Sequence, residues 1–173
     1  MTKIVHNRQK KIMKVIGKQR NSKMCYICGM ENPEGLKAQF YNMEDGSVMT
    51  KFRYREVHQS FPQRVHGGLI AAMLDELAFR AYWCKDETML GATMSMETKF
   101  RKPVPYETEL IGKGIVVKDL SKFFTAEVSL LDKDGVVYAD GVVKYIKLPI
   151  EKIAQADFHE EMKYLVEDNI TEI

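Results

Sequence analysis

The stretch that decides the fold is VHGGLIAAMLDELAFRAYWC, at residues 65–84. After its two glycines, apolar side chains occupy nearly every side of the helix that it would form, so Gly67 to Cys84 is expected to be one long buried helix. Strand-like segments lie on both sides of it, at residues 36–43, 47–56, 89–100, 108–118, 123–131 and 136–147. The sequence therefore predicts an α+β domain, in which an antiparallel sheet wraps around one central helix.

Short turn-forming sequences separate the predicted strands. Residues 44–46 (Glu-Asp-Gly) and residues 132–135 each have the composition of a hairpin turn. Residues 58–65 contain a proline and are expected to form a loop that leads into the helix.

Both ends of the chain are expected to add helices. Residues 6–19 mix apolar side chains with lysines, as short amphipathic helices do, and residues 149–168 also favour a helix. We therefore divide the chain into a basic N-terminal helical arm at residues 1–24, the α+β domain at residues 25–148 and a C-terminal helical extension at residues 149–173.

Composition and charge limit the class of protein. The 173 residues are 45% hydrophobic, which suits a single globular domain. The net charge is only +2, so no nucleic-acid partner is expected, and the acid-free first 30 residues are interpreted as a solvated helix face. No secretory h-region or membrane-spanning apolar run is found, so we expect a cytoplasmic protein with no membrane partner.

Two glycines at a helix start are unusual, because each costs about 1 kcal/mol relative to alanine. Gly67 and Gly68 would let a ligand approach the backbone closely, and the first N–H groups of a helix have no partner within it. Such donors can hold a carbonyl oxygen while it gains negative charge. The alternative, which the residues alone leave open, is tight packing of the preceding loop on the sheet.

Asp75 is a carboxylate in an otherwise apolar helix. Glu76 has a partner four residues on, Arg80, whereas the neighbours of Asp75 at helical spacing are three alanines and a phenylalanine. A buried acid without a partner is costly and is a candidate for a functional site. A hydroxyl or an N–H of the sheet could equally satisfy this acid, and the sequence leaves both interpretations open.

Asp75 and Gly67 can act on the same atoms only in an oligomer. They are eight residues apart, which is about 12 Å along a helix axis. A base and an oxyanion donor must both come within about 3 Å of the reacting atoms. Two helices packed antiparallel across a two-fold axis would bring Gly67 of one subunit to Asp75 of the other.

The run from Val65 to Glu76 resembles the HGG-x6-D signature of PaaI-like hotdog thioesterases. CYICGMENPEGL at residues 25–36 and TKFRKPVP at residues 98–105 resemble other segments of that family, so the likeness covers roughly residues 25–146. The resemblance implies a hotdog fold for residues 25–148 and hydrolysis of an acyl-CoA thioester to the free acid and CoA. It also implies a homodimer or a dimer of dimers that needs no cofactor.

The resemblance assigns catalytic roles to four residues. Asp75 would be the general base or the nucleophile that attacks the thioester. The Gly67 N–H would polarise the thioester carbonyl, and His66 would shape the helix start. Thr93 lies where relatives often carry a hydroxyl that helps to place water.

Five further residues are implied in substrate binding. Arg101 and Lys102 would lie near the CoA phosphates, and Gly68 belongs to the glycine turn. Some relatives have an asparagine at the position of Ser60, six residues before the histidine of the motif. Gln59 could substitute for that asparagine, which leaves the contacts to the carbonyl group open.

Two other functions fit the same sequence. A hotdog protein could bind acyl-CoA as a sensor or carrier without hydrolysing it, but the acid at position 75 favours catalysis. A hotdog dehydratase acting on hydroxyacyl thioesters would usually pair a histidine with an acid in a different arrangement, so we rank it last.

Cys25 and Cys28 have the spacing of a metal-binding pair. A four-ligand structural zinc site usually needs a second pair, which Cys84 and a histidine could supply only by accident of the fold. We therefore interpret these cysteines as small apolar side chains and predict no metal. His58 stands alone in the sequence and is expected to lie at the surface or in a loop.

Overall fold

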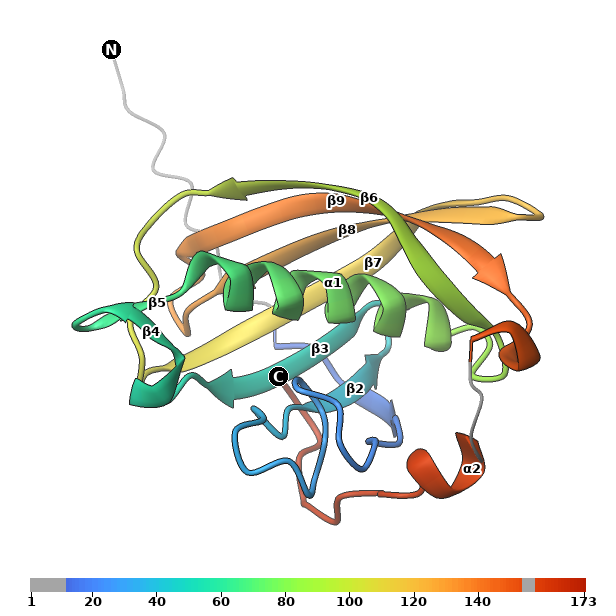
Figure 1. Cartoon of the computed structure of the whole chain (residues 1–173), viewed down its shortest axis with the longest axis horizontal. Coiled ribbons are helices and arrows are strands. Elements are labelled where there is room, and N and C mark those ends of the chain that lie inside the picture. The colour runs from blue at the N-terminus through green and yellow to red at the C-terminus, as the bar shows by residue number, and fades with distance from the viewer. Residues whose placement is uncertain (1–11, 154–157) are drawn as a thin grey trace.

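The computed structural model describes residues 12–153 and 158–173, and its main helix lies against a large curved sheet (Figure 1). The helix is α1 (Gly67–Trp83). The sheet has the strand order β1-β2-β3-β7-β8-β9-β6, and each described pair of neighbours is antiparallel. Its strands are β1 (Val15–Lys18), β2 (Gln39–Met43), β3 (Val48–Arg53), β6 (Leu90–Phe100), β7 (Glu109–Asp119), β8 (Phe123–Leu131) and β9 (Val137–Leu148).

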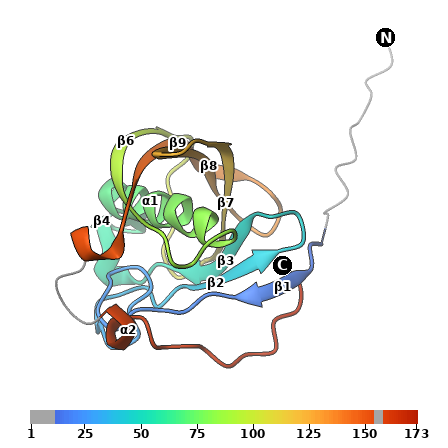
Figure 2. The same ribbon diagram turned by 90° about the vertical axis from the view of Figure 1, so that its right-hand side faces the viewer.

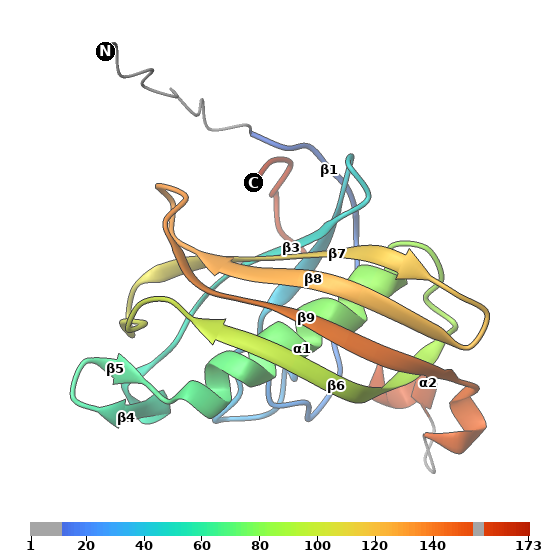
Figure 3. The same ribbon diagram turned by 90° about the horizontal axis from the view of Figure 1, so that it is seen from above.

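The sheet curls around α1, which is clear when the molecule is viewed along the helix (Figure 2). Strands β6 to β9 cross over the helix (Figure 3). The face of α1 that meets the sheet includes Met73, Leu74 and Leu77, none of which is exposed to solvent. The helix packs closely on β7, because a Cβ atom at Gly114 would lie 2.6 Å from the Leu77 carbonyl oxygen. This is the predicted arrangement of one central helix and an antiparallel sheet.

The predicted helix and the four strands after it are confirmed to within one residue at each end. Both predicted hairpin turns are also confirmed, because each joins two paired strands through a glycine with φ of 78°. The predicted loop at residues 58–65 contains a small hairpin of β4 (Gln59–Phe61) and β5 (Arg64–Val65). It follows the short 3-10 helix η1 (Glu56–His58).

The prediction of an N-terminal helix is wrong at residues 15–18, which form β1 and pair with β2. Residues 6–11 of that predicted helix lie outside the described residues. The strand forms because Met13 and Val15 pack on a second apolar cluster, whereas the alternating residues Ile12, Lys14 and Ile16 are exposed. Buried and exposed side chains therefore alternate at every second residue, as in a strand, and not at every third or fourth residue, as on a helix face.

The predicted C-terminal helix at residues 149–168 is also wrong. The described residues of this segment contain only two short helical turns, η2 (Ile150–Lys152) and α2 (Phe158–Glu161). Beyond α2 the chain runs back toward β1, where the Met13 N–H donates to the Ile173 carbonyl oxygen at 2.9 Å. Ile170 and Ile173 pack on the second apolar cluster. Hydrogen bonds to the segment before and in β1 satisfy backbone N–H and C=O groups of the extended tail, so the tail does not need to form a helix.

The sequence predicts His58 at the surface or in a loop; it is buried, at the end of the short 3-10 helix η1, so the surface alternative is wrong. Its Nδ1 accepts a hydrogen bond from the Arg55 N–H at 2.9 Å, and its Nε2 lies 2.9 Å from the Glu34 carbonyl oxygen. The ring therefore joins the loop that contains Glu34 to the segment around Arg55, which precedes α1 in the chain. Within the described residues, no helix has both the length and the apolar character that crossing a bilayer requires.

Asp45, in the turn between β2 and β3, is expected to make stability depend on pH. Partial burial raises the pKa of its carboxyl, but hydrogen bonds from Ser47 and Lys113 outweigh this and lower the pKa to about 2. A lowered folded-state pKa stabilises the protein above the unfolded pKa, near 4, and this contribution is lost as the pH falls toward 2.

The variant Asp45→Asn should therefore lower the free energy of unfolding above pH 4, by about 1 kcal/mol because the ion pair is partly exposed. The difference from the unmodified protein should shrink as the pH falls through the folded-state pKa of about 2 and vanish below it. Denaturant titrations at a series of pH values measure it, with the exposed Asp134→Asn in the other hairpin turn as the control. A difference that is independent of pH would contradict the assignment.

Candidate active site

Asp75 lies in the middle of α1, and its carboxylate faces the sheet. Its Oδ1 accepts a hydrogen bond from the Thr93 hydroxyl at 2.8 Å and lies 2.7 Å from the Tyr145 hydroxyl. Thr93 of β6 and Tyr145 of β9 are directly paired in the sheet, so one position of the sheet provides both partners. Within the described residues, no hydrogen bond reaches Oδ2. One carboxylate oxygen is thus held in place, and the other is available for chemistry.

Tyr145 is a site residue that the sequence prediction missed. It is 3% exposed, and its ring stacks on Phe124 with centroids 5.0 Å apart. Burial raises the pKa of the Tyr145 phenol, and the charge of Asp75 raises it further. The phenol therefore remains a proton donor toward Asp75. The available signal was a tyrosine at an inward-facing position of a strand, two residues after the buried Val143.

The start of α1 presents a backbone donor. His66 is the N-cap residue, and its Nδ1 accepts a hydrogen bond from the Gly68 N–H at 3.0 Å. In the described part of the chain, the Gly67 N–H donates to no acceptor. A Cβ atom at Gly67 would only touch the Phe100 ring, at 3.8 Å. The turn thus leaves the Gly67 donor free while the side chain of His66 uses the Gly68 donor.

A pocket of about 400 Å³ lies beside this helix start. Its lining includes Gly67 and the two predicted phosphate-binding residues, Arg101 and Lys102. Arg101 also forms an ion pair with Asp140, whose oxygens lie 2.9 and 3.1 Å from its guanidinium nitrogens. Arg64 adds a third cation that the sequence prediction did not include. The structure therefore brings together three basic side chains and a free backbone donor.

Gln59 and Ser60 lie on β4, in the hairpin that precedes the helix, and both are exposed. They do not line the pocket beside Gly67. Their predicted contact with a substrate carbonyl therefore stays a prediction.

Within one chain, the two halves of the candidate site are separate. Gly67 begins α1 and Asp75 lies eight residues further along the same continuous helix, about 12 Å away. The pocket at the helix start contains Gly67 but not Asp75. A single chain therefore holds one donor and one acid that cannot reach the same reacting atom.

The sequence matches the family described as Thioesterase superfamily over residues 63–139. The matched range contains the glycine turn, Asp75, Thr93 and the basic residues of the pocket. This part of the chain, less than half of its length, is similar to the thioesterase superfamily. Its resemblance to PaaI-like hotdog thioesterases is thereby confirmed. The comparison with curated protein sequences finds no match.

Solved structures of thioesterase superfamily proteins share the fold of this chain. One such protein is 23% identical with a TM-score of 0.66, and the alignment covers 70% of this chain and 59% of the other. Zebrafish thioesterase superfamily member 2 is 18% identical with a TM-score of 0.61, over 69% of this chain and 88% of the other. The PaaI protein of the E. coli phenylacetic acid degradation operon is 14% identical with a TM-score of 0.59, over 65% and 80%.

Proposed function

We propose that the protein hydrolyses acyl-CoA thioesters to the free acid and CoA. The observation that carries this proposal is the state of Asp75, a helix carboxylate with one oxygen fixed by two hydroxyl groups and the other oxygen unengaged. A carboxylate held in this way approaches the substrate in a defined orientation and loses little conformational entropy on reaching the transition state. The match of residues 63–139 to the thioesterase superfamily supports a thioester as the group attacked.

In the proposed reaction, Asp75 either attacks the thioester carbon itself or removes a proton from the water that attacks it. The carbonyl oxygen gains negative charge and accepts a hydrogen bond from the Gly67 N–H of a second chain. The C–S bond then breaks, and CoA leaves as the thiolate that takes up a proton. Where Asp75 itself attacks, water then hydrolyses the resulting anhydride, which releases the free acid and restores the Asp75 carboxylate. Thr93 and Tyr145 hold the Asp75 carboxylate in one orientation throughout the reaction. No cofactor takes part.

The second chain is required because each chain separates Gly67 from Asp75. A homodimer, alone or as half of a dimer of dimers, would contain two complete sites. Strand β6 supports such an assembly, because it is the last strand of the sheet and has no neighbour on one side in the described chain. It also exposes Met94 and Phe100, two large apolar side chains that a partner can cover.

Incubation with a panel of acyl-CoAs and a thiol reagent tests the proposal. Release of free CoA in proportion to enzyme is the expected result, and the panel identifies the acyl group. Binding of acyl-CoA by calorimetry without any release would contradict hydrolysis and favour the alternative, a protein that binds acyl-CoA as a sensor or carrier.

The basic residues of the pocket are expected to bind the CoA phosphates. The double variant Arg64→Glu with Lys102→Glu should raise KM for acyl-CoA about tenfold, because each charge reversal removes an exposed attraction of under about 1 kcal/mol and adds a repulsion. Its kcat should not change. Hydrolysis of the same acyl group on N-acetylcysteamine, which has no phosphate, should be unaffected.

The matched control is Lys133→Glu, in the exposed turn between β8 and β9, which should leave both KM values unchanged. Equal increases in KM for acyl-CoA and for the phosphate-free thioester would show that the pocket does not recognise phosphate.

A further inference from the structure

Cys25 and Cys28 lie in a tight turn that points both sulfur atoms to one side. The backbone N–H groups of Ile27 and Cys28 donate to the Cys25 Sγ at 3.3 and 3.5 Å. The Gly29 N–H closes the turn by donating to the Cys25 carbonyl oxygen at 2.8 Å. A Cβ atom at Gly29 would lie 2.3 Å from that oxygen, so the turn requires glycine. These backbone donors fix the position of the Cys25 sulfur beside that of Cys28.

The central helix supplies a third ligand atom to this turn. The Oε2 of Glu76 lies 4.0 Å from the Cys25 Sγ, and the two sulfurs and a Glu76 oxygen all lie within 4.8 Å of one another. Two sulfurs bound to zinc at about 2.3 Å in a tetrahedral site are about 3.8 Å apart. The three atoms therefore need to move together by at most about 1 Å to bind one ion.

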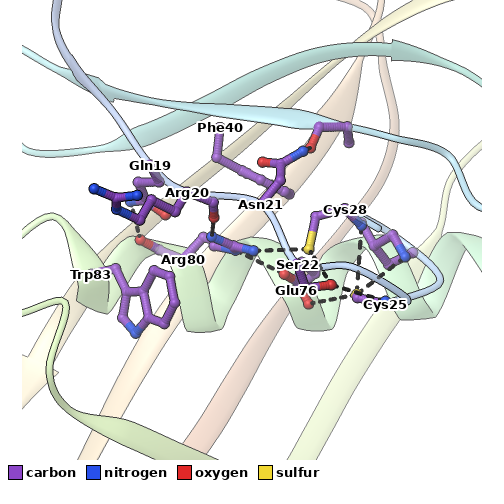
Figure 4. A network of polar contacts seen from close by, with 12 residues as sticks. Gln19, Arg20, Asn21, Ser22, Cys25, Cys28, Phe40, Glu76, Arg80 and Trp83 are labelled. Atoms are coloured by element: carbon purple, nitrogen blue, oxygen red, sulfur yellow. Dashed lines mark hydrogen bonds and ion pairs between the residues drawn. The ribbon is translucent and has the colours of Figure 1, made fainter. Parts of the chain in front are cut away.

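Arg80 balances the charge that such an ion would leave. Its guanidinium is 1% exposed and donates to Glu76 Oε1 at 2.8 Å and to Cys28 Sγ at 2.9 Å (Figure 4). It also stacks over the rings of Phe40 and Trp83. Two thiolates and a carboxylate around a divalent cation carry a net charge of about −1, which one guanidinium neutralises. Because Arg80 contacts Oε1, the other Glu76 oxygen stays directed at Cys25.

We propose that Cys25, Cys28 and Glu76 bind a thiophilic divalent cation, with zinc as the favoured ion and a water molecule as the fourth ligand. Binding releases the protons of the two thiols as the two metal–sulfur bonds form. Cys25 is partly exposed, which provides the route for the ion and for the water.

The structure removes the objection that a second cysteine pair is lacking. Cys84 lies elsewhere, with its Sγ 3.3 Å from Asn42 Oδ1, and takes no part. A carboxylate of α1 replaces the second pair. The ion would fasten the loop before β2 to the central helix at Glu76, and this proposal does not rest on the proposed function.

Cobalt binding to the full chain tests the proposal. The reduced protein is stripped of metal with a chelator under argon and titrated with Co²⁺ alone, followed by Zn²⁺. One Co²⁺ per chain is expected, with a sulfur-to-cobalt charge-transfer band in the near ultraviolet and the visible bands of a tetrahedral site, all displaced by Zn²⁺. Absence of the charge-transfer band in the unmodified protein overturns the proposal.

Variants assign the ligands. The double variant Cys25→Ser with Cys28→Ser should lose the charge-transfer band, whereas the matched control Cys84→Ser should keep it. Glu76→Gln should keep the band but bind Co²⁺ at least about tenfold more weakly. A band that persists in the double serine variant, or that disappears in Cys84→Ser while its circular dichroism is native, also overturns the proposal.

Discussion

Replacement of Asp75 by asparagine is expected to lower kcat for acyl-CoA hydrolysis by about a thousandfold. The amide has the shape of the carboxylate, and its oxygen can still accept hydrogen bonds from Thr93 and Tyr145. The fold and the melting temperature should therefore change little. The amide is neither a base nor a nucleophile, so the chemical step loses the group that starts it.

Steady-state release of CoA measures this effect, with circular dichroism as the check on folding. The matched control is Asp134→Asn, the same chemical change at an exposed turn, which should retain full activity. Hydrolysis by the Asp75→Asn variant at more than about a tenth of the normal rate would show that another group carries out the attack.

Replacement of Gly67 by proline is expected to lower kcat by about a hundredfold to a thousandfold, the cost of one oxyanion donor. Proline lacks the N–H that the mechanism uses, yet it suits the first position of a helix. His66 has φ of −65° and ψ of 132°, which is the conformation that a following proline requires. The substitution therefore removes a donor without breaking the helix.

Gly67→Ala provides the control, because it keeps the N–H and its Cβ atom would only touch Phe100. The alanine variant should retain most of the activity, while the proline variant loses it at an unchanged melting temperature. Equal losses in the two variants would indicate that the space at Gly67 matters and that its donor does not.

The central helix and the strands after it could be predicted from sequence because their patterns are local. The apolar run from Leu69 to Trp83 has the length of a helix, and the strands are bounded by turns with glycine. Residues 15–18 could not be predicted correctly, because their neighbours in space are β2 and the last residues of the chain. Such long-range pairing overrides a weak local preference for helix.

The candidate site was predictable where its residues are close together in the sequence. The glycine turn and Asp75 lie in one continuous motif, so the sequence identified both. Tyr145 and Arg64 were missed because their proximity to the site depends on strand register and on the fold of a loop. Glu76 was recognised only as the partner of Arg80, and its approach to the cysteine turn required the tertiary structure.

The central claim is that Gly67 and Asp75 of different chains act at one site, and mixed dimers test it most directly. Chains with Asp75→Asn and chains with Gly67→Pro are given different affinity tags, co-expressed and purified on both tags. Each mixed dimer then has one site with both residues intact and one with neither. The account predicts that these dimers regain about half of the normal activity, although each parent is nearly inactive. Mixed dimers as inactive as their parents would contradict it.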